Sequence, residues 1–135
     1  MKLTRASSYA LHAVAFMAQQ KHDRPIASHN IAQARGIPER FLLKVLKPLV
    51  SARVLQSVKG PNGGYRLAKP PSKITMLEVV EAVDGPIRGQ APLAQEGGHQ
   101  GGNLDPRLEA ICDEAAVLLR RRLGKVRVSD LVGRN

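Results

Sequence analysis

The chain has 135 residues, enough for one small domain with an appendage, and 43% of them are hydrophobic, an ordinary fraction for a globular protein. Its single cysteine excludes an intrachain disulfide framework and any all-cysteine zinc or iron–sulfur site, and it suits a reducing cytoplasm. No apolar run approaches the roughly 18 residues that predict a transmembrane helix. The unusual feature is a formal net charge of +10.

The excess positive charge lies in the first half of the chain. Residues 1–70 contain 12 Lys and Arg and only 2 acids, whereas residues 71–135 contain 9 basic and 9 acidic residues. This division predicts one polyanion-binding half and one half with another task; a uniformly solvated basic surface would not explain the difference. Two Tyr, two Phe and no Trp are a poor platform for stacking unpaired bases, so duplex DNA is the favoured polyanion. A membrane surface is disfavoured, because no basic helix with large exposed apolar residues is apparent.

The first predicted helix covers residues 4–21. Apolar side chains recur there at a spacing of three to four, and Thr4 or Ser7 can serve as the N-cap. The basic and then apolar N-terminus also raises the question of a signal peptide. We prefer the helix, because His12 interrupts the apolar stretch and cleavage would remove the first helix of an organised domain.

Two further helices follow in the basic half. Ser28 is predicted to cap a short helix that Gly36 closes in a left-handed conformation. Pro38 then opens a third helix, and Pro48 would kink that helix near its end. The stripe predicted to be buried on the third helix consists of Phe41, Leu42, Val45, Leu46 and Leu49. Its other face carries Glu39, Arg40, Leu43, Lys44 and Lys47.

A β-hairpin is predicted after these helices. Residues 54–58 alternate like a strand, residues 65–68 can pair with them, and the intervening loop KGPNGG is rich in glycine. Glycines supply positive φ angles and let backbone amides approach phosphates closely. A plain hairpin turn is the simpler interpretation of this loop, and the missing GK[ST] ending excludes a Walker A motif. Helix-turn-helix followed by a basic hairpin is, however, the order of a winged helix.

The second half begins with a predicted capping box at Thr75 and Glu78, which starts a helix that ends at Asp84. A glycine-rich loop follows, and then a helix over about 105–123 with Asp105 as its cap and Pro106 in its first turn. Its apolar stripe is longer than a small domain needs, which predicts pairing with a second copy of the chain. The predicted dimer-interface residues are Leu108, Ile111, Cys112, Ala115, Leu118 and Leu119. A short apolar tail with Ser129 as a candidate cap ends the pattern.

The predicted fold class is therefore mainly α with a small β-hairpin. Residues 1–84 are expected to form a winged helix-turn-helix domain that binds DNA. Residues 85–103 are expected to form a flexible glycine-rich loop, and residues 104–135 a dimerisation helix and tail.

Four segments resemble the BadM/IscR/NsrR-type (Rrf) family of bacterial winged-helix transcription regulators: MKLTRASSYALHA, IAQARGIPERFLLKVL, SVKGPNGGYRLAKPP and ITMLEVVEAVDG. The resemblance covers residues 1–85 in order and extends more loosely to residue 132. It implies a homodimeric regulator, in our interpretation a repressor, on a pseudo-palindromic operator, with the third helix in the major groove and the wing near the minor groove.

The family's DNA contacts transfer to this chain position by position. The resemblance implies Glu39, Arg40, Leu43 and Lys44 as base-facing residues. It implies Lys59, Pro61, Asn62 and Gly63 as wing contacts. Phosphate contacts are implied for Arg5, Ser28, Lys47 and Arg66.

The chain departs from the family where many members bind an iron–sulfur cluster through three cysteines. The corresponding region reads GPIRGQAPLAQEGGHQGGNLDPRLEAIC, with His99 where such members often carry a cysteine. One histidine and the distant thiol of Cys112 cannot hold a cluster. The chain therefore resembles the cluster-less branch, and neither a cofactor nor a metal site is expected.

Several functional assignments have simpler alternatives. For Cys112 a packing thiol is preferred to a redox sensor, which would need an exposed, electropositive setting. His99 is expected to be exposed to solvent. No Ser/His/Asp arrangement, paired carboxylates or HExxH helix is present, so no catalytic site and no enzyme activity are expected.

The expected partners are double-stranded DNA and a second copy of the chain, with an unidentified small-molecule or protein effector, at the nucleoid in the cytoplasm. The alternative function is a winged-helix module that has lost DNA binding and holds a partner protein. The one-sided positive charge disfavours that alternative.

Overall fold

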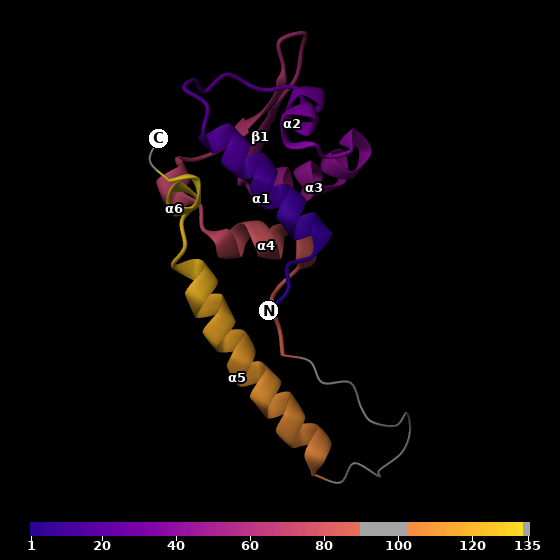
Figure 1. Cartoon of the computed structure of the whole chain (residues 1–135), viewed down its shortest axis with the longest axis vertical. Coiled ribbons are helices and arrows are strands. Elements are labelled where there is room, and N and C mark those ends of the chain that lie inside the picture. Colours follow the sequence, from indigo (N-terminus) through magenta and orange to yellow (C-terminus); the bar gives the residue numbers. More distant parts are fainter. Residues whose placement is uncertain (90–102, 134–135) are drawn as a thin grey trace.

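The computed structural model describes residues 1–89 and 103–133. Its elements, in chain order, are α1 (Arg5–Ala18), α2 (Ser28–Arg35), α3 (Glu39–Ser51), β1 (Leu55–Val58), β2 (Gly64–Leu67), the 3₁₀ turn η1 (Pro71–Lys73), α4 (Met76–Asp84), α5 (Leu104–Gly124) and α6 (Val128–Val132). Figure 1 shows that all elements except α5 gather in one body, from which α5 projects. This mainly helical winged-helix architecture with a two-stranded hairpin confirms the predicted fold class.

The start of α1 is fixed by hydrogen bonds from two hydroxyl side chains. The Thr4 hydroxyl accepts a hydrogen bond from the Ser7 N–H at 3.0 Å, which makes Thr4, and not Ser7, the N-cap. Ser7 is fully buried, and its hydroxyl donates to the Asp84 carboxylate at the end of α4. The helix ends at Ala18, three residues before the predicted end, where the Gln20 side-chain amide donates to the Phe16 carbonyl at 2.8 Å.

The predicted cap of α2 is wrong. Ala27 has the extended backbone of an N-cap and no capping side chain, whereas Ser28 is already the first helical residue. The Ser28 hydroxyl donates instead to a Glu39 carboxylate oxygen at 3.0 Å. The predicted left-handed end at Gly36 is confirmed by a φ of +63°.

The helix α3 buries one apolar stripe against the body. Its buried side chains are Leu42, Val45, Leu46 and Leu49, as predicted. Phe41 was predicted in the same stripe, but its side chain is 37% exposed. It precedes Leu42 by one residue, about 100° around the helix, and therefore lies at the edge of the stripe.

The wing is an antiparallel hairpin with Leu55 opposite Leu67 and Val58 opposite Gly64. Ile26 forms an isolated antiparallel bridge to β2, because it exchanges two backbone hydrogen bonds of 2.8 and 2.9 Å with Tyr65. A Cβ atom on Gly64 would collide with the carbonyl oxygen of Ile26, so this close approach of the two segments requires glycine. The Ile26–Tyr65 bridge therefore connects the loop that precedes α2 to the wing.

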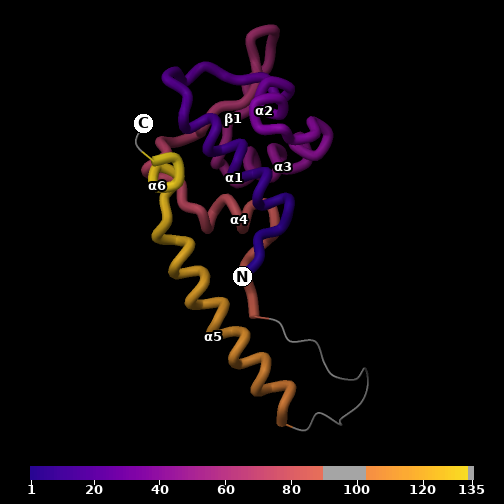
Figure 2. The backbone as a smooth tube through the Cα atoms, in the orientation of Figure 1, coloured from indigo at the N-terminus to yellow at the C-terminus, as the bar shows by residue number. Residues whose placement is uncertain are grey.

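The C-terminal part of the chain returns to the body (Figure 2). The capping box at Thr75 and Glu78 that starts α4 is confirmed. Backbone hydrogen bonds of 2.8 Å join Met76 to Val126 and Val128 to Ile74, and the Val128 side chain is buried in the core. The tail is therefore part of the winged-helix body, which the sequence did not indicate.

Two further cap predictions in this part are wrong. Asn103, and not Asp105, is the N-cap of α5. Asp105 lies in the first turn, where its negative charge interacts favourably with the positive end of the helix dipole. Arg127 precedes α6, and its N–H donates to the Asp130 carboxylate at 2.9 Å, so Ser129 is not the cap. None of the helices in the described part of the chain combines the length and apolar character that crossing a bilayer requires.

Candidate nucleic-acid interface

The outer face of α3 presents the five predicted side chains to solvent. Glu39, Arg40, Leu43, Lys44 and Lys47 are all exposed, opposite the buried stripe that anchors the helix. Such a helix, held by one face and basic on the other, can enter a major groove with its first two turns toward the bases. The sequence pattern thus located this face without the structure.

An aromatic ring lies close to two of these cations, an arrangement that was not predicted from the sequence. The Arg40 guanidinium lies 5.1 Å and the Lys44 ammonium 5.7 Å from the centre of the Phe41 ring. Cation–π attraction, about 0.5–1 kcal/mol at exposed sites, favours positions of both side chains near the ring. The spacing i, i+1 and i+4 of these three residues was the available signal.

Ser28 and Glu39 meet where α2 and α3 both begin. Their 3.0 Å hydrogen bond holds the Glu39 carboxylate beside α2, on the exposed side of the motif. A carboxylate in that place can accept a hydrogen bond from a cytosine amino group. Ser28, predicted as a phosphate contact, is engaged with Glu39 instead of being free to turn outward.

The wing tip is a tight turn of exposed residues. Lys59, Pro61 and Asn62 are exposed, and the Gly63 N–H closes the turn by donating to the Gly60 carbonyl at 2.9 Å. Arg66 lies farther down the hairpin, where its Nε donates to the Gln56 side chain at 2.9 Å.

A groove of about 780 Å³ separates the wing tip from the start of α2. The wing contributes Pro61, Asn62 and Gly63 to it, and the opposite wall includes His22, Arg24, His29 and Asn30. These four polar residues were not among the predicted contacts. Their closeness in sequence to the predicted start of the second helix was the signal that could have identified them.

Arg5 is set apart from the other predicted contacts. It begins α1 at the end of that helix beside α4, where Thr4 and Ser7 bond to Asp84 (Figure 1). The wing lies at the far side of the body. The structure therefore separates the start of α1 from the wing candidates.

The predicted dimer residues divide between two faces of α5. Ile111 and Leu118 are 62% and 65% exposed, and Leu108 and Ala115 are also exposed. Cys112 and Leu119 are half-buried on the side toward the body, where Gly89 lies against the backbone of Cys112 and Asp113. His99 lies outside the described residues.

Within residues 1–89 and 103–133, no group of three His, Cys, Asp or Glu side chains is arranged to hold a metal ion. The exposed cations and amides of α3 and the wing are instead donors suited to phosphate oxygens and base edges.

Comparison with known proteins agrees with this geometry. The model of the Rrf2 family, described as an iron-dependent transcriptional regulator, matches residues 3–134. The HTH-type transcriptional regulator CymR of Bacillus subtilis is 30% identical over 87 residues, which are 64% of this chain and 63% of CymR. IscR of Aliivibrio salmonicida is 34% identical over 97 residues, which are 72% of this chain and 58% of IscR.

The solved structure of CymR, the global cysteine regulator of B. subtilis, shares the fold. It superposes with a TM-score of 0.77 at 23% identity, over 98% of this chain and 96% of that one. The sequence alignments with curated relatives are shorter: they cover about 60% of the length of CymR and IscR and about half of others. The chain belongs to the Rrf2 family of transcriptional regulators.

Proposed function

We propose that the chain is a sequence-specific DNA-binding regulator that acts as a homodimer on a pseudo-palindromic operator and represses transcription. The observation that carries the proposal is the shared exposure of the α3 cations and the wing in a half with 12 basic and 2 acidic residues. The family match supports the regulatory role. Repression follows if the bound dimer covers a promoter.

The exposed apolar stripe of α5 supports the dimer. Leu104, Leu108, Ile111, Ala115 and Leu118 are alternately four and three residues apart, which is the spacing of a helix–helix seam. A two-fold dimer would place its two α3 helices in major grooves on the same side of the duplex. The two half-sites of the operator should then lie one or two helical turns apart, at about 34–36 Å per turn.

The family description includes iron, but the donor set of this chain does not fit an iron–sulfur cluster. Cys112 is the only thiol, and clusters are held by several thiolates. We therefore propose regulation without a cluster. Protein purified anaerobically should be colourless and contain iron far below one atom per chain; stoichiometric iron and sulfide would contradict this part of the proposal.

A salt titration tests DNA binding itself. If a dimer neutralises roughly 6–10 phosphates, its affinity for an in-vitro selected duplex should fall about 10³–10⁵-fold between 50 and 200 mM salt. Fluorescence anisotropy on labelled duplexes measures this slope. A flat salt response or the absence of binding would contradict the proposal and favour a module that holds a partner protein.

A further inference from the structure

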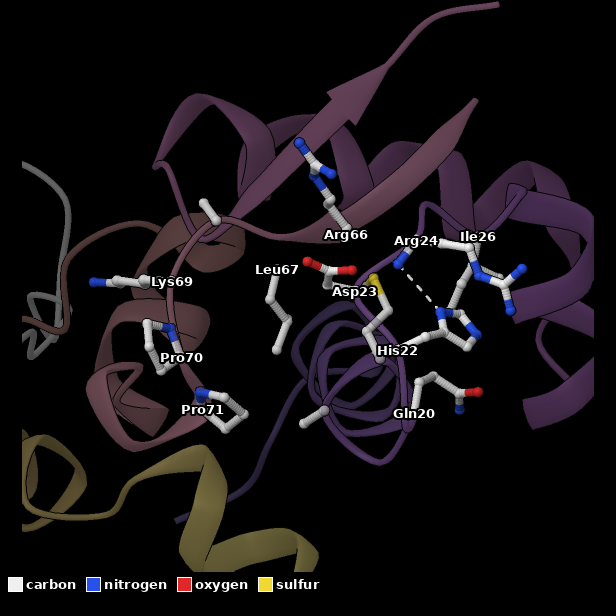
Figure 3. Close-up of a pocket in the computed structure, with 13 residues that line it drawn as sticks. Gln20, His22, Asp23, Arg24, Ile26, Arg66, Leu67, Lys69, Pro70 and Pro71 are labelled. Atoms are coloured by element: carbon white, nitrogen blue, oxygen red, sulfur yellow. Dashed lines mark hydrogen bonds between the residues drawn. The ribbon is translucent and has the colours of Figure 1, made fainter. Parts of the chain in front are cut away.

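A cavity of about 310 Å³ lies beside the end of β2 that leaves the wing (Figure 3). It is enclosed by the C-terminal end of α1, the loop over residues 20–26 and the segment 66–71 that leaves the wing. Its apolar wall consists of Met17, Ala18, Ile26, Leu67, Pro70 and Pro71. The volume is at the lower end of the range of small-molecule pockets, about 300–1,000 Å³.

The cationic groups around the cavity are engaged or turned outward. Lys69 pairs with Glu78 at 2.9 Å, and Arg66 donates to Gln56 at 2.9 Å. The Arg24 side chain points away from the cavity in Figure 3. These cations are therefore poor candidates for holding an anion inside it.

Asp23 is the exception among the charged residues of this wall. Its carboxylate faces Leu67 across the opening (Figure 3). No hydrogen bond or ion pair to it occurs among the residues that the structure describes. An apolar pocket with one carboxylate open at its edge complements a molecule with an apolar body and one positively charged hydrogen-bond donor.

We propose that this cavity is an effector site for a small amphiphilic organic cation, with Asp23 as the ligand of its ammonium group. The apolar body would occupy the space between Leu67 and the end of α1. The choice of a cation rests on complementarity to the one open charge. An amphiphilic anion would instead face the Asp23 carboxylate.

The cavity shares its walls with the DNA-facing surface. The backbone N–H and carbonyl of Ile26 are both hydrogen-bonded to Tyr65 of β2. A shift of the loop over residues 20–26 should therefore move β2 with it. His22 and Arg24 line both the cavity and the groove beside the wing tip. Occupancy should therefore displace the wing and weaken DNA binding; this second part rests on the proposed DNA-binding function.

Three compounds of similar shape test the binding site. They are 2-phenylethylamine, the neutral 2-phenylethanol and the anionic 3-phenylpropanoate, each titrated into the full-length chain and followed by ¹H–¹⁵N NMR spectra. We expect the amine to shift the amide signals of Asp23, Leu67 and Ala68. It should bind about threefold more tightly than the alcohol, because both compounds can donate a hydrogen bond to the exposed carboxylate and only the ammonium adds an ion pair. Tightest binding by 3-phenylpropanoate, or no shift at these amides with any compound, would overturn the proposal.

Two variants show whether Asp23 provides the selectivity. Asp23→Asn keeps the shape of the side chain and should reduce the preference for the amine over the alcohol to about one. Glu114→Gln removes the same charge from an exposed position on α5 and should leave the preference unchanged. Equal preference in Asp23→Asn and the unmodified chain would overturn the role of Asp23.

The effect on DNA is measured separately. Saturating 2-phenylethylamine should weaken binding to a selected duplex about fivefold in the unmodified chain, at the lower end of typical allosteric coupling, and not in Asp23→Asn at the same concentration. If the amine binds without changing DNA affinity, the proposed coupling is wrong, but the proposed binding site is still supported. A chain that binds the amine but no DNA would contradict the proposed function alone.

Discussion

We propose that Arg40 of α3 reads a base. It is exposed in the first turn, and the Phe41 ring below it limits the conformations that binding must freeze. An arginine there grips a guanine with two hydrogen bonds, worth about 1–3 kcal/mol of discrimination. We therefore expect Arg40→Ala to relax sequence preference at one base pair in each half-site, measured by in-vitro selection with both proteins.

Lys59 provides the matched comparison on the wing. It is exposed beside the glycine turn, where a phosphate is the expected partner. A phosphate carries no sequence information, so Lys59→Ala should weaken binding to all duplexes alike and lower the salt slope by about one for each phosphate that is no longer neutralised. A changed base preference in Lys59→Ala would mean that the wing reads the minor groove. Unchanged affinity and preference in Arg40→Ala would mean that α3 is not docked as we propose.

At the scale of elements, the turn from α3 into the wing contains a strained residue. Arg53 has a φ of +64°, a left-handed conformation that favours glycine. The N–H groups of Arg53 and Val54 donate to Val50 and Leu49, each at 3.0 Å, which fixes this turn. The strain is therefore imposed by the way the helix ends.

Replacing this residue should raise stability. We expect Arg53→Gly to increase the free energy of unfolding by about 0.5–1 kcal/mol, because relief of the left-handed strain exceeds the entropy cost of glycine. Urea titration followed by circular dichroism measures the change. Arg53→Ala keeps the strained backbone and serves as the control; an equal gain in both variants would show that loss of the arginine side chain, and not backbone relief, is responsible.

Local chemistry made most elements predictable. The capping box of α4, the left-handed Gly36 and the glycine-rich turn of the wing each depend on residues a few positions apart, and each was found from sequence. The prediction that Ser28 caps α2 was wrong, because its hydroxyl instead donates a hydrogen bond to Glu39, eleven residues away.

The candidate site was predictable in part, for the same reason. Helical periodicity separated the α3 cations from the buried stripe, but it could not place Phe41, at the edge of that stripe, close to the two cations. The groove beside the wing, and the cavity edged by Asp23, depend on the pairing of Ile26 with Tyr65. Ile26 and Tyr65 are 39 positions apart, and a contact between such distant residues produces no periodic pattern in the sequence from which it could be predicted.

At the scale of the whole molecule, α5 is tied to the winged-helix body at its C-terminal end. Leu123 is buried there, and the chain then returns through Val126 and Val128 to pair with the start of α4. Arg120 also reaches Glu81 of α4, at 3.4 Å. An event on α5 can therefore be transmitted to the body that carries α3.

The exposed stripe of α5 leads to a test of the dimer. Leu118 is 65% exposed in a single chain, and burial of one such side chain contributes about 1.5–3 kcal/mol. A two-fold interface contains the residue twice, so Leu118→Glu should raise the dimer dissociation constant at least about 100-fold, measured by sedimentation velocity. Val117 is also exposed and apolar, but it lies about 100° away around the helix, outside the stripe. Val117→Glu should therefore leave the dimer intact. If Leu118→Glu remains as dimeric as Val117→Glu, the two copies do not meet along this stripe, and the half-site spacing expected from it no longer applies.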